Sequence, residues 1–218
     1  IAAERAKLLR STPMDGHQAS GSGRRSSARG IEAKYSRFYA ERSRRQVYPV
    51  EFVVRVFLGT YPNLRMNRER YAGSRILDLG FGDGRNMPLL HNLGFSVYGV
   101  EISEEILALT RSRLGDLRVP AQLGVGRNAR IPFDSGFFHY ALACHSCYYV
   151  DKGDTFDANL REVHRVLATD GIFVCSLPFH DTYILKGAKH LPGGHYEITH
   201  DPYGLRKGTV FRAFRTKA

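Results

Sequence analysis

The sequence of 218 residues has few cysteines and no long apolar run. Its three cysteines, Cys144, Cys147 and Cys175, do not form the disulfide framework of a small secreted domain and favour a reducing, cytoplasmic location. Cys144 and Cys147 also lack the second pair that would complete a tetrahedral zinc site, so we predict no metal. No stretch approaches the roughly 18–20 apolar residues of a membrane helix, and residues 1–30 have no apolar signal core. We therefore expect no membrane association.

Acidic residues are scarce at both ends of the chain. Residues 1–45 hold 11 Lys and Arg against 4 Asp and Glu, and residues 186–218 hold 7 against 2. The 140 residues between them hold 14 Lys and Arg against 15 Asp and Glu, so this central segment is nearly neutral although the net charge of the chain is +11. A nucleic-acid groove needs a basic stripe on the folded face. This charge distribution argues against a nucleic-acid partner.

Large apolar residues are almost absent from residues 11–30, which are rich in Ser, Gly and Arg. Such a segment cannot bury enough surface to offset its ordering entropy, so residues 1–30 are predicted to be a flexible basic tail or linker. Because the chain begins with Ile1 rather than methionine, we expect it to be part of a longer polypeptide. Residues 31–218 are predicted to form one domain, with helices over 31–70, a core over 71–179 and a hairpin or tail over 180–218.

Apolar runs and helical patterns alternate through the core. Strands are predicted at 75–80, 95–101, 121–126, 137–146 and 171–179, and helices at 86–92, 103–114 and 155–167. An amphipathic helix is predicted upstream, from about 49 to 59. This order predicts an α/β, Rossmann-like parallel sheet flanked by helices, with an N-terminal helical extension. Ligands of such sheets bind at the carboxyl ends of the strands.

The segment RILDLGFGDGRN, residues 75–86, places three glycines at alternate positions after the first strand. A phosphate loop would end in Gly-Lys-Ser/Thr, and a dinucleotide turn would read G-x-G-x-x-G. Here the order is G-x-G-x-G, and we expect the carboxylate of Asp83 to repel a pyrophosphate. A cationic ligand that needs close backbone approach fits better, and S-adenosylmethionine, with its sulfonium and ammonium groups, is such a ligand.

The demands of S-adenosylmethionine can be assigned to residues. Gly80 and Gly82 would let the backbone approach its amino-acid and ribose parts, and Asp78 would attract the ammonium directly or through water. Glu101, at the end of the second strand, would accept hydrogen bonds from the ribose hydroxyls, and Ile102 would cover one face of the adenine. The other cofactor-binding candidates are Phe81, Gly84, Arg127, Asn128 and Cys144.

Several motifs in order resemble the class I S-adenosylmethionine-dependent methyltransferases: LDLGFGDGRN, VYGVEIS, IPF, HYALACHSCYYV and LREVHRVLATDGIFVCSLP. GRN after the glycines, with YPVEFVVRVF upstream, is similar to the small-molecule branch that includes tellurite-resistance-type enzymes. The resemblance covers about residues 35–179. It implies S-adenosylmethionine as cofactor, S-adenosylhomocysteine as product, and methyl transfer to the oxygen, nitrogen or sulfur of a small-molecule acceptor.

Two departures from the family pattern stand out. Arg127 occupies a place where many members have an acidic residue that binds the adenine amino group, so this contact would pass to Asn128 or to backbone. The family's sheet usually has seven strands, but only 39 residues follow Phe179. We therefore expect the C-terminal strands to be missing from this chain.

The candidate catalytic residues follow the fourth strand. Methyl transfer needs alignment and, for a hydroxyl or amine, removal of a proton. His145 and Tyr148 would emerge near the methyl group, with His145 as the base or as a positioning group; alternatively, this histidine packs on the adenine or on a helix. Tyr35 and Tyr39 would either cover the cofactor or pack within their helix. Two other functions stay open: an RNA or protein methyltransferase, and a non-catalytic S-adenosylmethionine-binding module of a larger protein.

Overall fold

The computed structural model describes residues 22–43, 45–59, 64 and 66–215, so the first 21 residues of the expected tail lie outside the described residues. In the described part, the larger sheet has five strands in the order β3-β2-β1-β4-β6. All four neighbouring pairs are parallel. The strands are β1 (Arg75–Leu79), β2 (Ser96–Glu101), β3 (Ala121–Val125), β4 (Phe138–Ala143) and β6 (Leu167–Cys175). The predicted Rossmann-like sheet is confirmed.

Alternate residues of each strand face opposite helical layers, as the two-residue period of a strand requires. Ile76 packs in a cluster with α2 (Glu51–Leu58), α3 (Met87–Asn92) and α4 (Glu104–Asp116). Leu77 and Leu79 pack in a second cluster with α5 (Phe156–Val166). Short 3₁₀ turns lie at Arg68–Arg70, Tyr183–Leu185 and Pro192–Gly194. The sheet is therefore buried on both faces, and a ligand can reach it from an end of its strands.

The helices that follow β2 and β4 begin at capping residues. The Ser103 side chain accepts a hydrogen bond from the backbone N–H of Ile106 (3.3 Å), and Thr155 accepts one from Ala158 (3.0 Å). Each cap satisfies a backbone donor at the start of its helix and fixes where the preceding loop ends. The predicted helix at 103–114 is confirmed, with α4 continuing to Asp116. In the described part of the chain, no helix has the length and apolar character needed to cross a bilayer.

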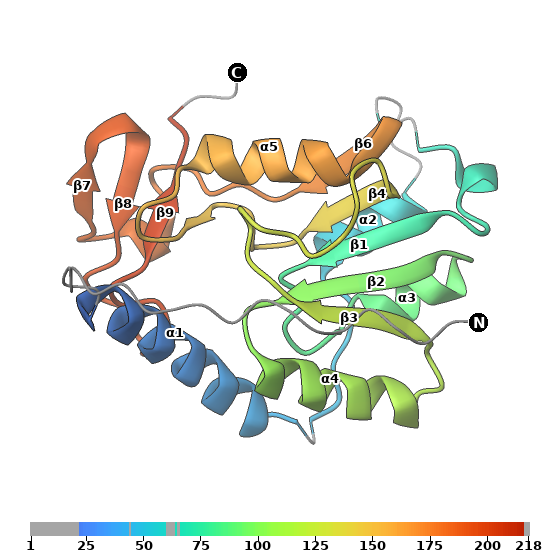
Figure 1. Ribbon diagram of the computed structural model, residues 1–218, viewed down its shortest axis with the longest axis horizontal. Coiled ribbons are helices and arrows are strands. Elements are labelled where there is room, and N and C mark those ends of the chain that lie inside the picture. Colours follow the sequence, from blue (N-terminus) through green and yellow to red (C-terminus); the bar gives the residue numbers. More distant parts are fainter. Residues whose placement is uncertain (1–21, 44, 60–63, 65, 216–218) are drawn as a thin grey trace, which may run out of the picture.

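A second, smaller sheet lies beyond the carboxyl ends of the large-sheet strands (Figure 1). Its order is β5 (Tyr149–Val150), β9 (Val210–Arg212), β8 (His195–Glu197) and β7 (Lys189–Leu191). The antiparallel pair β8–β9 corresponds to the two alternating segments expected in the C-terminal hairpin. β5 and β7 were not expected from the sequence. This sheet has its own core, which includes Tyr148, Tyr196 and Phe211.

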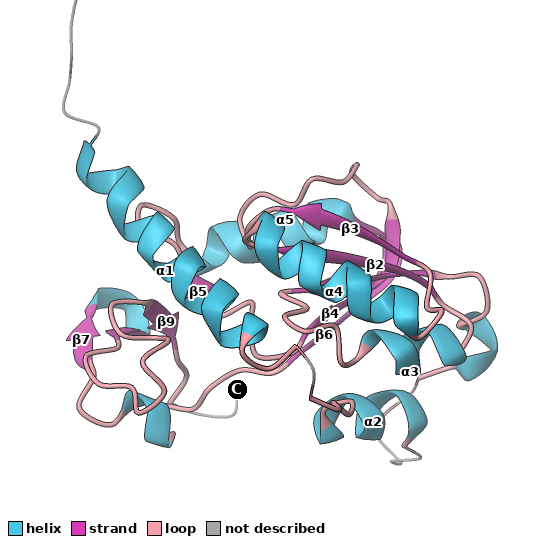
Figure 2. Cartoon of the chain, turned by 90° about the horizontal axis from the view of Figure 1, so that it is seen from below, coloured by secondary structure: helices cyan, strands magenta, loops and turns pink. Residues whose placement is uncertain are grey.

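The first helix is longer than expected. α1 extends over Ser22–Ala40, so residues 22–30, expected in the flexible tail, are helical. The physical reason is cooperative: once residues 31–40 are held against the protein, each further helical residue adds one backbone hydrogen bond. Both views show α1 running from the small sheet to α4 (Figures 1 and 2). It crosses the end of the large sheet where a ligand is expected.

Candidate functional site

Asp78 lies near the carboxyl end of β1 and is 1% exposed. It pairs in register with Gly99 of β2 and Leu142 of β4, so no neighbouring strand offers it a counter-charge. Its Oδ2 is buried and has no hydrogen-bond partner among the described residues. Burial, together with the charges of Glu101 and Asp83, raises the pKa of Asp78 to about 7. A buried carboxylate without a partner is suited to a cationic ligand.

Glu101 closes the other side of the turn after β1. Its Oε1 accepts a hydrogen bond from the backbone N–H of Gly82 (3.2 Å), and its Oε2 accepts one from Ile102. Burial raises the pKa of Glu101, and these two backbone donors oppose that rise. Because a carboxylate oxygen can accept more than one hydrogen bond, both oxygens retain capacity for the ribose hydroxyls of a nucleoside.

All three glycines of the turn have positive φ, which glycine adopts without strain: Gly80 at 72°, Gly82 at 57° and Gly84 at 70°. A Cβ at Gly80 would lie 2.5 Å from the Cβ of Ser146, and one at Gly84 would lie 2.6 Å from the Cγ2 of Thr110. Gly80 therefore allows the segment after β4 to approach. Gly84 serves the packing of the turn on α4.

Asp83 of the glycine turn is paired with two arginines. Its carboxylate accepts hydrogen bonds from the Arg85 guanidinium (2.9 and 2.6 Å) and lies 3.7 Å from Arg113 of α4. The two arginines offset its charge, but Asp83 still contributes to the raised pKa of Asp78. Arg113 also donates to the carbonyl of Ser43, so Asp83 ties the turn to the end of α1 through α4.

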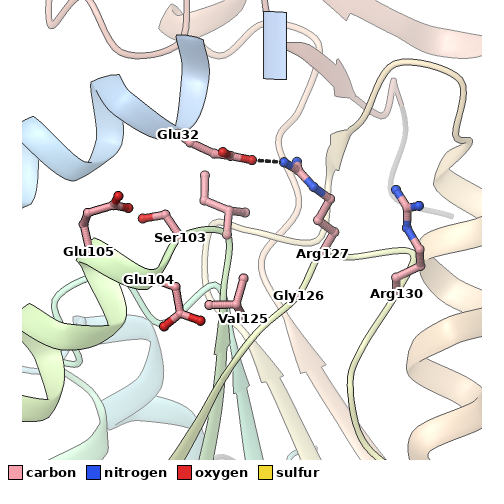
Figure 3. Close-up of a pocket in the computed structure, with 9 residues that line it drawn as sticks. Glu32, Ser103, Glu104, Glu105, Val125, Gly126, Arg127 and Arg130 are labelled. Atoms are coloured by element: carbon pink, nitrogen blue, oxygen red, sulfur yellow. Dashed lines mark hydrogen bonds and ion pairs between the residues drawn. The ribbon is translucent and has the colours of Figure 1, made fainter. Parts of the chain in front are cut away.

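A cavity of about 630 Å³ opens at the ends of β2 and β3. Ile102 and Arg127 both line it, at the place expected for an adenine. Figure 3 shows Glu32 of α1 reaching across to the Arg127 guanidinium, with which it forms an ion pair. Arg127 also pairs with Asp151 (3.1 Å). Arg127 is thus neutralised, and it holds α1 at the edge of the cavity.

Two cofactor candidates have their side chains committed elsewhere. The Asn128 amide nitrogen donates to the backbone carbonyls of Ser146 (2.9 Å) and Tyr149 (3.0 Å). This places Asn128 in the support of the segment after β4, where its amide hydrogens are not available to an adenine. Phe81 is 3% exposed and packs in the core beside Gly99. Any contact of Phe81 with a ligand would have to come from its backbone.

Tyr39 of α1 fills the space over the glycine turn. A Cβ added at Gly82 would collide with its hydroxyl group. Burial raises the pKa of Tyr39, and the nearby charges of Glu101 and Asp83 raise it further. The ring therefore lies where an amino-acid or ribose part of a bound nucleoside would meet Gly82 and Glu101.

His145 lies at the end of β4, with φ at 61°, a left-handed conformation that is uncommon for a residue other than glycine. Its backbone N–H donates to the Ser176 hydroxyl (2.8 Å), which also lies 3.2 Å from its Nδ1. When Nδ1 carries the proton and donates to Ser176, Nε2 is available as a proton acceptor. Loss of solvation and the charge of Arg206 lower the pKa of His145, which favours the neutral ring.

Cys144 and Tyr148, which lie near His145 in the sequence, both have raised pKa values. Cys144 is half-buried, and burial together with the charge of Asp78 raises its pKa to about 12, so the thiol stays protonated. Tyr148 is 7% exposed and packs edge-on against Phe211, at 5.0 Å between ring centroids. Burial raises the pKa of Tyr148, which makes it a poor base. Of the two catalytic candidates, the geometry favours His145.

The site includes residues that the sequence analysis did not select. Ser146 touches Gly80 and donates to the carbonyl of Leu79, and Arg206 approaches from the loop between β8 and β9. A small residue two positions after Cys144 was the only signal for Ser146. Nothing in the sequence pointed to Arg206, because its role depends on how the small sheet docks. In the described part of the chain, no three His, Cys, Asp or Glu side chains are grouped to hold a metal.

The fold and this arrangement agree with comparisons to known proteins. Residues 77–175 match the methyltransferase domain family. The matched region, residues 77–175, includes Asp78, the glycine turn, Glu101 and His145. The match supports S-adenosylmethionine as the cofactor, and the unpartnered Oδ2 of Asp78 fits its ammonium group.

Curated relatives share the same region. "Putative methyltransferase YqeM" of Bacillus subtilis is 29% identical over 100 residues, which are 46% of this chain and 40% of that protein. "Uncharacterized protein MJ1252" of Methanocaldococcus jannaschii is 28% identical over 147 residues, 66% of this chain and 53% of that protein. The chain thus spans about half the length of the curated relatives it matches.

A solved structure supports the architecture. The PH0226 protein of Pyrococcus horikoshii has a TM-score of 0.51 and 22% sequence identity, and the match covers 76% of this chain and 84% of that one. At this identity the likeness establishes the fold alone. The structural match thus covers more of the chain than residues 77–175.

Proposed function

We propose that this chain transfers a methyl group from S-adenosylmethionine to a small-molecule acceptor. The observation that carries the proposal is the buried Asp78 carboxylate, whose Oδ2 has no hydrogen-bond partner among the described residues. It lies between a turn of positive-φ glycines and Glu101, at the carboxyl end of the sheet. An ammonium group would supply the missing partner for Asp78, and a ribose would supply hydroxyls for Glu101.

S-adenosylmethionine would provide a methyl group on a positively charged sulfur, which a nucleophile can displace. The chain would supply binding, orientation and proton removal. Asp78 would bind the ammonium group of the cofactor, Glu101 would bind its ribose, and Ile102 would cover its adenine. His145 would take the proton from an acceptor hydroxyl or amine at Nε2, while Ser176 fixes the ring through Nδ1.

The small-molecule acceptor is supported by the surroundings of the site. α1 and the small sheet cover the carboxyl ends of the large-sheet strands (Figure 1). The sequence between the basic ends is nearly neutral, with 14 basic and 15 acidic residues. We also propose membership of the tellurite-resistance-type branch. In support of this, the two segments that carry the resemblance meet, since the backbone N–H of Val50 donates to the Asn86 side chain (3.0 Å).

Calorimetric titration with S-adenosylmethionine and S-adenosylhomocysteine tests the cofactor assignment. We expect both to bind, and Asp78→Asn to weaken binding by about ten- to a hundredfold, because a hydrogen bond to a charged group contributes about 1.5–3 kcal/mol. Asp116→Asn, at the exposed end of α4, is the control and should bind as the wild type does. If neither compound binds the wild type, the proposal is wrong.

A methyl-transfer assay distinguishes a small-molecule methyltransferase from an RNA or protein methyltransferase and from a non-catalytic binding module. With S-adenosylmethionine carrying a labelled methyl group, we expect label in small molecules of a cell extract. Label in added RNA or protein would contradict the small-molecule assignment. Cofactor binding without any transfer would instead identify a non-catalytic binding module.

A further inference from the structure

Arg206 presents a buried hydrogen-bond donor that the protein does not use. Its Nε donates to the Tyr149 hydroxyl (3.3 Å). Its Nη1 is buried and has no hydrogen-bond partner among the described residues. The nearest carboxylate oxygen, Oδ1 of Asp201, lies 3.6 Å away, which gives an ion pair but is too long for a hydrogen bond. A buried guanidinium N–H without an acceptor is unfavourable unless a ligand supplies one.

Asp201 is itself occupied with the loop that carries Arg206. Its carboxylate accepts hydrogen bonds from the backbone N–H groups of Tyr203 (3.1 Å), Leu205 (2.9 Å) and Arg206 (2.7 Å). These three bonds fold the loop and draw on the carboxylate's capacity as an acceptor. Asp201 therefore positions Arg206 and offsets its charge only in part.

Two tyrosine hydroxyls beside Arg206 provide a further hydrogen-bond donor without an acceptor. The Tyr149 hydroxyl lies 2.9 Å from that of Tyr35, on α1. One phenolic proton bridges the two oxygens, and the Arg206 Nε–H also points at Tyr149. The second phenolic proton, on Tyr35 or Tyr149, then has no acceptor within this trio. The trio thus offers one phenolic O–H and one guanidinium N–H to an acceptor from outside.

The trio lies on the substrate side of the proposed methyl-transfer site. Tyr149 belongs to the segment after β4, which also contains His145 and contacts Gly80 through Ser146. Tyr35 lies one helical turn before Tyr39, which covers Gly82. Arg206 is close enough to His145 to lower its pKa. A group bound by the trio would thus lie beside the proposed base.

We infer that Arg206, with Tyr35 and Tyr149, binds a carboxylate of the methyl acceptor. This inference rests on the proposed function and specifies its substrate class. The planar guanidinium matches the two oxygens of a carboxylate, and a charge-assisted bond from Nη1 would satisfy the buried donor. The acceptor is therefore a carboxylic acid whose nucleophilic atom reaches toward His145.

The test combines labelling with variants of Arg206. Wild-type protein is incubated with S-adenosylmethionine bearing a trideuterated methyl group and a small-molecule cell extract, and labelled products are identified by mass spectrometry. In a parallel extract, carboxyl groups are first converted to methylamides. We expect every labelled product to retain a carboxyl group and the converted extract to give none. Labelled products without a carboxyl group would overturn the inference.

The variants separate recognition from stability. With an acceptor so identified, Arg206→Gln should raise KM about tenfold or more, with kcat changed less, because one charge-assisted contact is lost. Arg206→Lys, which keeps the charge but not the fork, should recover part of this loss. Lys207→Gln, an exposed neighbour in the same loop, is the control for net charge and should match the wild type. Unchanged KM in Arg206→Gln would overturn the inference.

Two further measurements address a variant that does not fold and binding of the cofactor by Arg206. If Arg206→Gln does not fold, the double variant Tyr35→Phe/Tyr149→Phe removes both phenolic protons and should raise KM severalfold in a folded protein; an unchanged KM would count against the inference. Calorimetry with S-adenosylhomocysteine and with 5′-methylthioadenosine, which lacks the amino-acid part, tests the cofactor. If Arg206→Gln weakens only the former, Arg206 binds the cofactor's carboxylate, which overturns the inference. Absence of binding by the wild type would instead refute the proposed function.

Discussion

Asp78, which we propose binds the ammonium group of the cofactor, opposes folding because its carboxylate is buried. Its pKa is about 7 in the folded protein against an ordinary value of 3.8, so the folded state binds more protons between these two values. The free energy of unfolding therefore falls as pH rises through this window and levels off above about 7.

The first prediction follows from that titration. Asp78→Asn lacks the buried charge, so its stability relative to the wild type should increase from pH 4 to pH 7, by up to about 4 kcal/mol, and then stay constant. Urea unfolding at several pH values measures the difference. Asp116→Asn should show no comparable trend. A wild-type stability that rises from pH 4 to pH 7 relative to Asp78→Asn would contradict the buried ionisation.

Gly80 allows a second prediction at the same scale. Gly80→Ala places a Cβ 2.5 Å from the Cβ of Ser146 at a φ of 72°, so it combines a clash with backbone strain. Gly136→Ala, at a φ of 67° with nothing within 4 Å of the added Cβ, has the strain alone. We expect Gly136→Ala to lose about 1 kcal/mol of unfolding free energy, and Gly80→Ala to lose at least about 1 kcal/mol more. Equal losses would show that Ser146 does not need the close approach.

At the scale of elements, the sequence predicted those parts of the fold that local patterns determine. The large-sheet strands follow from apolar runs, and the helices predicted at 103–114 and 155–167 begin at the capping side chains of Ser103 and Thr155. β5 and β7 are only two and three residues long, and their pairing depends on docking of distant segments. The start of α1 at Ser22 was missed because its first residues have no apolar periodicity.

The candidate site also combines residues that local sequence patterns indicate with residues whose contacts depend on distant segments. Asp78, the glycines and Glu101 could be found because a strand end followed by a turn is a local pattern. Asn128 was predicted to bind the cofactor and Tyr148 to be catalytic from their positions after strands; in the structure the Asn128 amide donates to a backbone carbonyl and Tyr148 packs in the small-sheet core. Which way a side chain turns depends on long-range packing, which sequence spacing does not encode.

α1 covers the cofactor side of the site, and this leads to an element-scale prediction. Tyr39 fills the space over Gly82, so we expect α1 to shift when S-adenosylhomocysteine reaches the turn. The hydroxyls of Ser36 on α1 and Ser103 are 3.0 Å apart. A disulfide in Ser36→Cys/Ser103→Cys would link α1 to the residue that caps α4.

We expect the oxidised double variant to bind S-adenosylhomocysteine at least about tenfold more slowly than the same protein after reduction, as measured by stopped-flow fluorescence or calorimetry. Ser103→Cys alone controls for the lost cap on α4, which contributes about 1 kcal/mol. Equal association rates before and after reduction would show that rotation of the Tyr39 ring, without movement of the helix, is sufficient for entry.

At the scale of the whole molecule, the charge distribution determines how RNA binding to this chain should be interpreted. The excess of basic residues lies in residues 1–45 and 186–218, and the 140 residues between them have a net charge of −1. Basic ends attract any polyanion, so RNA binding alone would not be informative, and its affinity should fall steeply between 50 and 200 mM salt. The informative quantity is whether bound RNA becomes methylated.

We expect tRNA and rRNA to take up no labelled methyl group, because α1 and the small sheet lie over the carboxyl ends of the strands (Figure 1). Transfer to a small acceptor should depend little on salt over the same range, since one contact with a guanidinium involves few released counterions. Labelled RNA, or small-molecule transfer that falls a hundredfold between 50 and 200 mM salt, would assign the basic ends to substrate recognition. Scintillation counting of precipitated RNA beside mass spectrometry of the soluble fraction distinguishes the two results in one reaction.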